Sequence, residues 1–513
     1  MAIPGAMSEL RRPVHTTDHE DIDGLSDLSE PLDEQRTAPA PVLSFLEKRN
    51  LLFLCTLYFI HAIPLQFSWL TMPIILRQQL NYSDVGTFLI SQYPYSWKAA
   101  WSPLVDGLHH PRIGRRKTWI VPSLVLGGAA LFWLALAQDS LVTEVASGRS
   151  LAMVWLVLAW FLVMLACANI RIALDSWSIN LLSPANVHWA SSTATIGETA
   201  ASLVSCIIFL GVTSLTSQKD QNGKEEPAST RLFLGASATA FVATAVLLLV
   251  GKTEGDKAQH SQPIRKVYTI IWEILKLRHA WILMLVHMAS MIGFITNDTI
   301  TTLQLVKKNF SDLDLAVLAA VGLPFAIGGS FVVAKAFKTR HPLEVWRSMF
   351  PWRLVLAFVS QLTILFVSQY PNSPFRWFVV VLPYCLSVLF SVAMWVAFVA
   401  FHAQVSDPQF GGIYMSVLAT TLNIRYDTLQ FLCTEAIGMI DGNDDLTKPS
   451  PLIDGYQIVN LTTVILAIPI YWFFLKPATL HLETIDASAW RIKYQGSADA
   501  MAYEMVVPLE DDE

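Results

Sequence analysis

Charged residues are scarce in this chain of 513 residues: Asp, Glu, Lys and Arg together make up 15% of it, whereas an ordinary soluble protein has about 25%. Hydrophobic residues make up 53%, and the mean hydropathy is +0.45. This composition excludes a soluble enzyme, a nucleic-acid-binding protein and a disordered scaffold, and it indicates a membrane protein in contact with lipid. The net charge of −6 gives no reason to expect a nucleic-acid partner.

Cysteine is also rare, and this bears on metals and cofactors. All five cysteines fall inside apolar segments, so neither a disulfide framework nor a zinc site with paired spacing is readable. The glycine pairs Gly127-Gly128 and Gly328-Gly329 lie between no strand and helix, and they indicate helix packing in a membrane rather than a phosphate loop. We therefore expect no metal and no cofactor.

Long apolar segments recur along most of the chain. Eight of them contain 17 or more consecutive residues without Asp, Glu, Lys, Arg or His, and a helix of that length can cross roughly 30 Å of hydrocarbon. The predicted fold is therefore an all-α integral membrane protein with twelve transmembrane helices. The twelve segments lie near residues 51–76, 85–105, 118–137, 150–177, 188–217, 232–250, 280–306, 315–336, 354–370, 377–403, 411–440 and 456–475.

A longer basic loop in the middle divides the twelve segments six plus six, which is typical of a duplicated transporter. Within that loop, residues 264–277 have apolar residues at helical spacing between charges, which fits either a helix on the membrane surface or a plain linker. The predicted domains are a disordered cytosolic tail at 1–45, a six-helix half at 46–250, the cytosolic linker at 251–279, a second six-helix half at 280–476, and a cytosolic tail at 477–513.

Lys and Arg in the loops predict the orientation of the chain in the membrane. If the amino terminus is cytosolic, the loops on the cytosolic side hold 15 of these residues and the loops on the other side hold nine. Both termini are therefore expected in the cytosol.

Two short motifs point to a gate between the predicted halves. Residues 103–106, Pro-Leu-Val-Asp, are followed by Gly-Arg-Arg-Lys at 114–117, a combination that resembles the loop signature of the major facilitator superfamily. An acidic residue there can bond a helix terminus and basic side chains, which would latch the halves in one state. We assign the gate to Asp106, Gly114, Arg115, Arg116 and Asp175; the alternative is a basic loop that only sets topology.

Three cations inside the apolar segments are candidate ligand contacts. Lys98, Arg171 and Arg425 each cost about 2.5–3.5 kcal/mol on insertion scales, so such residues are functional candidates by default. Together they favour an anionic, phosphorylated ligand, because guanidinium groups hold phosphate through paired hydrogen bonds. For Arg171 the alternative is a salt bridge to Asp175 or Glu198 that only holds helices together.

Several carboxylates accompany these cations. Glu198 and Asp298 are candidate substrate-site residues and could carry protons, although nothing in the sequence separates proton coupling from exchange. Asp427 and Glu435 share a segment with Arg425 and are expected to compensate its charge.

Longer stretches of the sequence resemble one family, the acetyl-coenzyme A transporters, from about residue 50 to residue 476. The matching residues are Ile63-Pro64-Leu65, Trp101 with Pro103-Leu104-Val105-Asp106, Gly114-Arg115-Arg116-Lys117 with Trp119-Ile120-Val121-Pro122, Ile172-Ala173 with Asp175 and Trp177, Ile292-Gly293-Phe294 with Asp298, Pro351 with Arg353, and Val405-Ser406-Asp407-Pro408 with Gly411-Gly412 and Tyr414-Met415.

The resemblance implies a major facilitator fold that moves acetyl-coenzyme A from the cytosol into the lumen of the endoplasmic reticulum. It also implies that Lys98 contacts a phosphate, and that Trp177 and Asp298 belong to the substrate site. The sequence departs from the family pattern at Arg171, where an acidic residue is expected, at Glu198, where glutamine is expected, and at Arg425-Tyr426, where a glycine pair is expected.

The sequence thus favours a multi-pass transporter, not an enzyme, that carries acetyl-coenzyme A by alternating access in the endoplasmic reticulum membrane. A second hypothesis is transport of another anionic metabolite, such as a peptidoglycan fragment or a folate-like compound. A third is a non-transporting receptor or an integral acyltransferase, which would need a catalytic base; His61 and His287 have no evident polar partner in the sequence. The oligomeric state is not set by the sequence.

Overall fold

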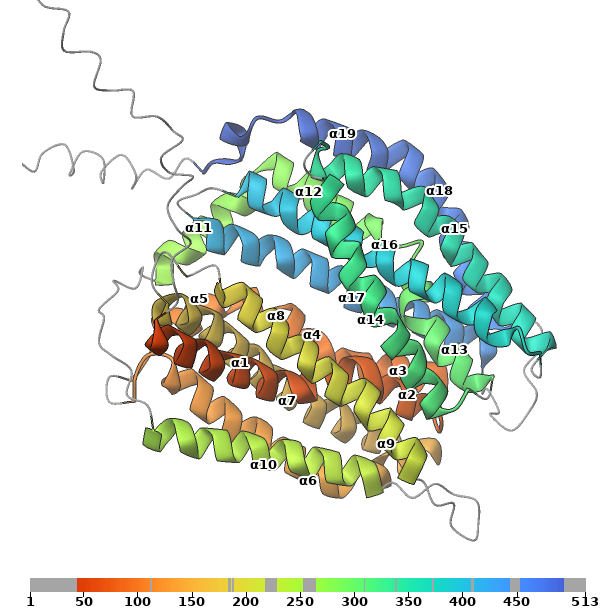
Figure 1. Cartoon of the computed structure of the whole chain (residues 1–513), viewed down its shortest axis with the longest axis horizontal. Coiled ribbons are helices and arrows are strands. Elements are labelled where there is room, and N and C mark those ends of the chain that lie inside the picture. Colours follow the sequence, from red (N-terminus) through yellow and green to blue (C-terminus); the bar gives the residue numbers. More distant parts are fainter. Residues whose placement is uncertain are drawn as a thin grey trace, which may run out of the picture. The chain divides into compact units, whose positions relative to one another are not determined.

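The computed structural model describes residues 44–492 with short gaps, and the described residues are almost entirely helical (Figure 1). They contain no strand beyond one isolated bridge between His110 and Gly114. The gaps are residues 111–112, 183–185, 187–188, 217–227, 252–263, 309, 337–338, 371–372, 407–409 and 443–452. The predicted tail at 1–45 lies outside the described residues except for its last two, and so does most of the tail at 477–513.

The helices fall into two groups along the chain. The first group consists of α1 (Phe45–Gln66), α2 (Met72–Arg77), α3 (Tyr82–Leu89), α4 (Tyr93–Ser96), α5 (Ser102–Gly107), α6 (Lys117–Ala146), α7 (Ser150–Leu181), α8 (Trp189–Ser202), α9 (Phe209–Thr216) and α10 (Ala228–Gly251). The second consists of α11 (Ile264–Lys276), α12 (Arg278–Ser290), α13 (Thr301–Lys307), α14 (Asp312–Ala336), α15 (Pro342–Gln369), α16 (Arg376–Val405), α17 (Gly411–Asp441), α18 (Gly455–Ile470) and α19 (Lys476–Thr484).

Nine helices of the described chain are long and apolar enough to cross a membrane, which supports a multi-pass membrane protein. Helices separated by a single π-helical turn count as one. The nine span Phe45–Arg77, Lys117–Ala146, Ser150–Ser178, Ser192–Ser214, Ser229–Gly251, Asp312–Gly329, Pro342–Gln369, Arg376–Val405 and Gly455–Thr484.

Three of the twelve predicted segments fall outside these nine, each for a physical reason. The segment near 85–105 is broken into α3, α4 and α5, because Pro94 and Pro103 stand in the first turns of new helices and lack the N–H that a continuous helix needs. The segment near 280–306 is interrupted between α12 and α13 by turns and a π-helical turn, Thr296–Ile300. Helix α17 is continuous but holds Arg425 and Asp427.

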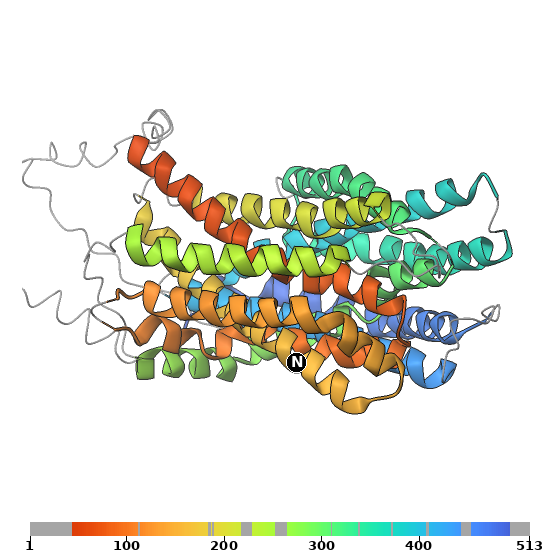
Figure 2. The same cartoon turned by 90° about the horizontal axis from the view of Figure 1, so that it is seen from below.

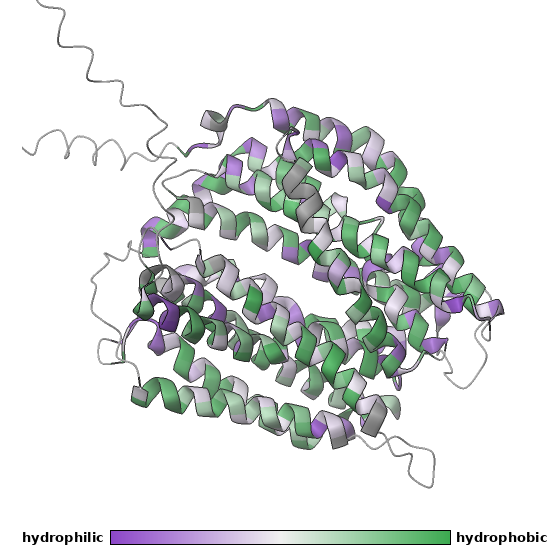
Figure 3. Cartoon of the chain, in the orientation of Figure 1, coloured by the Kyte–Doolittle hydropathy of each residue, from purple (hydrophilic) through white to green (hydrophobic). Residues whose placement is uncertain are grey.

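Large apolar side chains cover the outside of the bundle, as lipid contact requires. Val250 is 85% exposed and Phe473 84% exposed, and many more apolar side chains are at least half exposed. Hydrophobic residues predominate along the outer helices α6 and α10 (Figure 3). In water such a surface would promote aggregation, but in a bilayer it faces hydrocarbon.

Within each group the helices pack mainly on one another, and they run alongside one another (Figure 2). In the first group α6 packs on α7 and α10, and α1 packs on α8; in the second, α16 packs on α14 and α15. The most extensive contact between the groups joins α3 to α17, with further contacts between α2 and α13 and between α9 and α14.

Two segment boundaries differ from the sequence prediction. Helix α15 begins at Pro342 rather than near residue 354, so Arg347 and Arg353 lie in a helix and were wrongly counted as loop cations. Helical structure also continues past residue 476, through α19 to Thr484.

Residues 264–277, for which the sequence left a membrane-surface helix and a plain linker open, form helix α11, Ile264–Lys276. Its apolar side includes the buried side chains of Ile270 and Ile274, and it packs against α5, α12 and α17. The apolar stripe therefore contacts the bundle, which accounts for its helical spacing.

Candidate functional site

A cavity of about 350 Å³ lies where the two groups of helices meet. Helix α17 supplies Arg425, Asp427 and Gln430, while the first group supplies Trp69, Gln92 and Ser96. Its other lining side chains are mostly apolar or aromatic, including Trp346, Trp395 and Phe398. The cavity is thus an apolar pocket with a few charged groups, which is the usual character of a small-molecule site.

Arg425 is the most unusual lining residue, because it is buried without a carboxylate partner. It is 7% exposed. Its Nη1 donates to Ser290 Oγ and, at 3.4 Å, to the His287 carbonyl oxygen, both on α12. Its Nε has no hydrogen-bond partner, and no salt bridge to it is found among the described residues. A guanidinium held by neutral groups at a cavity wall is poised for an anion.

The expectation that Asp427 and Glu435 compensate Arg425 is wrong. Asp427 accepts a hydrogen bond from Ser96 Oγ of α4, and Glu435 accepts from Ser83 Oγ at 2.6 Å, in α3. Two residues along a helix are about 200° apart, so Asp427 leaves α17 on nearly the opposite side from Arg425.

A histidine pair lies behind Arg425. The Nε2 atoms of His287 and His402 are 3.1 Å apart, and His287 Nδ1 lies 2.7 Å from Thr421 Oγ1, one turn before Arg425 on α17. Both histidines are fully buried. The sequence shows no polar partner for His287 because its partners, Thr421 and His402, lie on other helices, and sequence spacing holds no signal for such contacts.

Asp298 and Arg353 form an ion pair at the same cavity. Arg353, on α15, also donates to Ser391 Oγ at 3.0 Å, and its guanidinium carbon lies 4.4 Å from the centroid of the Phe294 ring. Its side chain is 4% exposed. Asp298 was predicted for the substrate site and does line the cavity, but its charge is matched by a cation that the sequence had placed in a loop.

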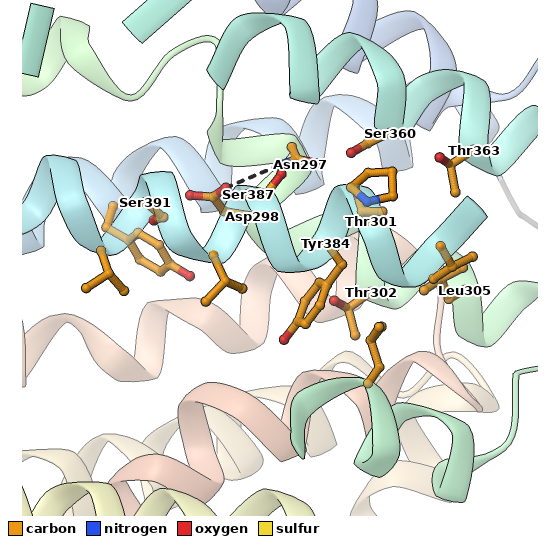
Figure 4. A pocket seen from close by; sticks show the side chains of 16 residues that line it. Asn297, Asp298, Thr301, Thr302, Leu305, Ser360, Thr363, Tyr384, Ser387 and Ser391 are labelled. Atoms are coloured by element: carbon orange, nitrogen blue, oxygen red, sulfur yellow. Dashed lines mark hydrogen bonds between the residues drawn. The ribbon is translucent and has the colours of Figure 1, made fainter. Parts of the chain in front are cut away.

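Figure 4 shows a second cavity, of about 240 Å³. It adjoins the first, because Asp298, Ser391 and Tyr426 line both. Its walls are rich in hydroxyl groups, and Asn297 Nδ2 donates to Ser387 Oγ across it at 3.3 Å. The hydroxyl-bearing residues that line it are Thr301, Thr302, Ser360, Thr363, Tyr384, Ser387, Ser391 and Tyr426. This part can exchange hydrogen bonds with a neutral polar group.

The predicted cations of the first group lie elsewhere. Arg171 on α7 pairs with Glu198 on α8, as the sequence analysis proposed, and also with Asp175 one turn away, at 2.8 Å. Tyr58 Oη donates to Asp175 Oδ1 at 2.8 Å. None of these residues lines either cavity. The arrangement neutralises Arg171 with two carboxylates and ties α1, α7 and α8 together.

Lys98 and Trp177 were also predicted for the substrate site, and neither lines the two cavities. The Lys98 ammonium lies 3.9 Å from the centroid of the Tyr95 ring, a cation–π contact. The described residues give it no ion-pair partner. Trp177 is buried and its ring meets Phe53 edge-on, with centroids 5.4 Å apart.

The predicted gate residues that the structure describes make contacts inside the first group. Arg116 Nη2 donates to Ser176 Oγ of α7 at 3.1 Å, next to Asp175. Gly114 has φ +102°, a conformation that favours glycine in the turn before α6. Arg115 lies in the same turn, and the side chain of Asp106 is outside the described part. No latch to the second group appears among the contacts described for these residues.

One cluster of contacts between the groups joins α3 to α13 and α17. Tyr82 Oη donates to Gln304 Oε1 at 2.8 Å, and Gln304 donates in turn to Asp454. A Cβ at Gly438 would lie 2.6 Å from the backbone nitrogen of Ser83, so only glycine allows α17 to approach α3 this closely. The groups are therefore closed against each other at these contacts.

The sequence analysis did not place Arg353 or Asp427 at the cavity wall, and it missed the aromatic wall formed by Trp69, Trp346 and Trp395. In the sequence Arg353 was only a match to the family pattern. In the structure it is buried on α15, where it pairs with Asp298. Tryptophan is common at membrane interfaces, so the sequence alone gives no reason to expect these three at a cavity wall. No group of three or more His, Cys, Asp or Glu residues in the described part could hold a metal ion.

Comparisons with known proteins agree with this architecture. The sequence profile of the family described as acetyl-coenzyme A transporter 1 matches residues 50–226 and 240–451. An uncharacterised protein of Schizosaccharomyces pombe is 27% identical over 475 residues, covering 88% of this chain and 90% of that protein. An uncharacterised membrane protein of Saccharomyces cerevisiae is 25% identical over 542 residues, covering 85% and 96%.

Solved transporter structures share the fold at low sequence identity. A bacterial homologue of the human lysosomal transporter Spinster, inward-facing and unoccupied, gives a TM-score of 0.58 at 14% identity and covers 88% of this chain and 98% of its own. The nucleoside transporter NupG gives 0.59 at 13% identity, covering 85% and 99%. A D-xylose–proton symporter gives 0.57 at 12% identity, covering 85% and 99%. These similarities establish a membrane-transporter fold of the major facilitator type.

Proposed function

We propose that this chain, which belongs to the acetyl-coenzyme A transporter family, carries acetyl-coenzyme A from the cytosol into the lumen of the endoplasmic reticulum. Family and fold place it among membrane transporters of small molecules. The choice of acetyl-coenzyme A, the organelle and the direction are the parts of the proposal that require experiment.

One observation supports an anionic substrate most directly: Arg425 is buried at the cavity wall without a carboxylate partner. A buried cation with no counter-ion is costly, and a ligand phosphate would remove that cost each time it binds. Ser290 and the His287 carbonyl hold the guanidinium in place before the ligand arrives. Such preorganisation raises affinity because less ordering is needed on binding.

The remaining walls suit the other parts of acetyl-coenzyme A. Trp69, Trp346 and Trp395 offer aromatic faces for the adenine ring, which can stack on such surfaces. The adjoining hydroxyl-rich cavity, with Ser387 and Tyr384, can hydrogen-bond the amides of the pantetheine arm. We place the phosphates at Arg425 for this reason.

The transport mechanism that we infer is alternating access between two six-helix halves, with twelve helices in all. In this proposal the three segments that bend or carry charge, containing α3–α5, α12–α13 and α17, cross the membrane beside the nine apolar helices and line the cavity. The end closed by Tyr82, Gln304 and Gly438 is the lumenal end, and both termini are cytosolic. In this proposal substrate enters from the opposite, cytosolic end.

Uptake into sealed proteoliposomes tests the proposed substrate. Vesicles containing the purified full-length protein should accumulate radiolabelled acetyl-coenzyme A above protein-free vesicles, and unlabelled acetyl-coenzyme A should compete better than free coenzyme A or unrelated anions such as folate. Accumulation of neutral solutes with no uptake of any phosphorylated one would disprove the proposal.

A related transporter of another anionic metabolite is the second candidate function. The observation that favours it is Arg425-Tyr426, where the family resemblance led us to expect a glycine pair, because both side chains occupy the cavity wall. Uptake of a folate-like compound or a peptidoglycan fragment in preference to acetyl-coenzyme A would support this candidate.

A further inference from the structure

Asp427 is the one carboxylate at the described cavity wall that has no cation beside it. It is 4% exposed, and its hydrogen bond comes from Ser96 Oγ. The other lining carboxylate, Asp298, is paired with Arg353. Glu198, which the sequence had offered as a proton carrier together with Asp298, is paired with Arg171.

The surroundings of Asp427 favour its neutral form. An ionised carboxylate buried without a cation is costly, whereas a protonated one needs only hydrogen bonds, and the Ser96 hydroxyl can supply one. The ionisable side chains that line the cavity or lie beside it are Tyr93, Lys98, His287, Asp298, Arg353, His402 and Tyr426. No hydrogen bond or ion pair between any of them and Asp427 is found among the described residues. Arg425 points to Ser290 instead.

Protonation of Asp427 changes the charge of the cavity at the moment when an anion would bind. The wall holds two guanidinium groups, Arg353 and Arg425, and the carboxylate of Asp298. The cavity therefore has a net charge of +1 while Asp427 is protonated and of zero once Asp427 ionises. An anion therefore binds more tightly when Asp427 is protonated. By linkage, a bound anion increases the proton affinity of Asp427 by the same factor.

We propose that Asp427 is a proton-binding site coupled to the anion site at Arg425, so that the protein takes up a proton together with each anionic substrate molecule. The inference rests on the proposed function for the identity of the anion. The proton binds a carboxylate oxygen of Asp427, which then remains neutral while cargo occupies the cavity. Proton and anion consequently cross the membrane together.

The hydrogen bond from Ser96 places this site where the two groups of helices meet. Ser96 belongs to α4 in the first group and Asp427 to α17 in the second. Any rearrangement that separates α4 from α17 would break this bond and expose the carboxyl to water, where it can lose its proton. Proton release is thus tied to the movement that releases the cargo.

Calorimetry of acetyl-coenzyme A binding tests the coupling. Titrations of the full-length protein in buffers of different ionisation enthalpy count the protons taken up on binding. For the wild type we expect uptake that approaches one proton as pH rises from 6 to 8.5, with affinity falling by up to tenfold per pH unit where Asp427 of the free protein is ionised. Asp427→Asn imitates the protonated form, so it should retain affinity and take up fewer protons.

Glu435→Gln is the matched control, because Glu435 lies two turns further along α17 and also accepts hydroxyl hydrogen bonds from the first group, but outside the cavity. It should behave like the wild type in the calorimeter. Proton uptake by Asp427→Asn equal to that of the wild type would overturn the proposal.

Infrared spectroscopy of the ligand-free protein gives a second, independent measurement. The carbonyl band of a protonated carboxylic acid should appear at low pH, fade as pH rises, be missing in Asp427→Asn, and persist in Glu435→Gln. If acetyl-coenzyme A does not bind but this band behaves as expected, the proposed substrate is wrong and the proton site stands. A band unchanged by Asp427→Asn would refute the proton site, whatever the substrate.

Discussion

Two arginines inside the bundle, Arg171 and Arg425, have opposite surroundings. Arg171 contacts two carboxylates, Asp175 and Glu198, and lines neither cavity. Among the described residues Arg425 donates hydrogen bonds only to a hydroxyl and a carbonyl oxygen, lies over the Phe398 ring, and lines the larger cavity. Both sit in segments that the sequence reads as membrane-spanning, so burial alone does not separate a structural charge from a ligand-binding one. The partner does.

This difference has an energetic basis. A cation in hydrocarbon needs compensation, either from a permanent partner or from a transient one. When Glu198 and Asp175 compensate Arg171, a ligand phosphate would have to compete with two carboxylates already in place. At Arg425 there is no such competitor among the described residues, so most of the attraction is left for the ligand.

Removing Arg425 should have the largest effect on substrate binding. Hydrogen bonds to charged groups are worth about 1.5–3 kcal/mol, so Arg425→Gln should weaken acetyl-coenzyme A binding by roughly 10- to 150-fold with little loss of folding stability. Uptake at low substrate concentration, together with the melting temperature, checks both parts. Arg425→Lys keeps the charge but not the planar guanidinium group, so its affinity for the substrate should lie between those of the wild type and Arg425→Gln. Undiminished uptake by Arg425→Gln would show that the anion binds elsewhere.

Removing Arg171 should instead damage stability. Arg171→Gln leaves Glu198 and Asp175 without their cation, and breaking a fully buried pair costs about 3–5 kcal/mol. The side chains here are 19% and 27% exposed for Arg171 and Glu198, so we expect about 1–3 kcal/mol after allowance for screening. Thermal or denaturant unfolding in detergent measures this loss.

The double variant Arg171→Gln with Glu198→Gln is the control for that loss. It removes one charge of each sign and should recover most of the stability while leaving substrate affinity near the wild-type value. A double variant that folds well but no longer binds substrate would place Arg171 in the substrate site, and the contrast with Arg425 would disappear.

The sequence predicted the helical class and the Arg171–Glu198 pair, because these depend on composition and on neighbouring segments. It could not predict the partners that belong to distant helices. Arg353 looked like a loop cation beside Pro351, yet α15 begins at Pro342 and buries it against Asp298. His402 meets His287 across 115 residues of chain, a distance over which spacing says nothing.

The sequence also misjudged Asp427 because nearness along a helix is not nearness in space. Its separation from Arg425 by two residues suggested compensation, but the helical rotation directs it to Ser96 of the other group. Residues three or four apart, such as Arg171 and Asp175, do share a face and were read correctly.

The surroundings of Lys98 are intermediate between those of Arg171 and those of Arg425. Replacing Lys98 should have the smallest effect on uptake of the changes considered. Like Arg425 it has no carboxylate partner in the described chain; like Arg171 it lines neither cavity, and its ammonium lies over the Tyr95 ring. As a partly exposed point charge outside both cavities, it can steer a phosphate without holding it tightly. Lys98→Ala should therefore weaken uptake by about two- to fivefold, equivalent to roughly 0.5–1 kcal/mol, and Lys98→Arg should preserve uptake. The effect should shrink as salt is added, because exposed charges are screened.

A loss of uptake as large as that of Arg425→Gln, and insensitive to salt, would instead place Lys98 in direct contact with the bound substrate, as the family resemblance implies.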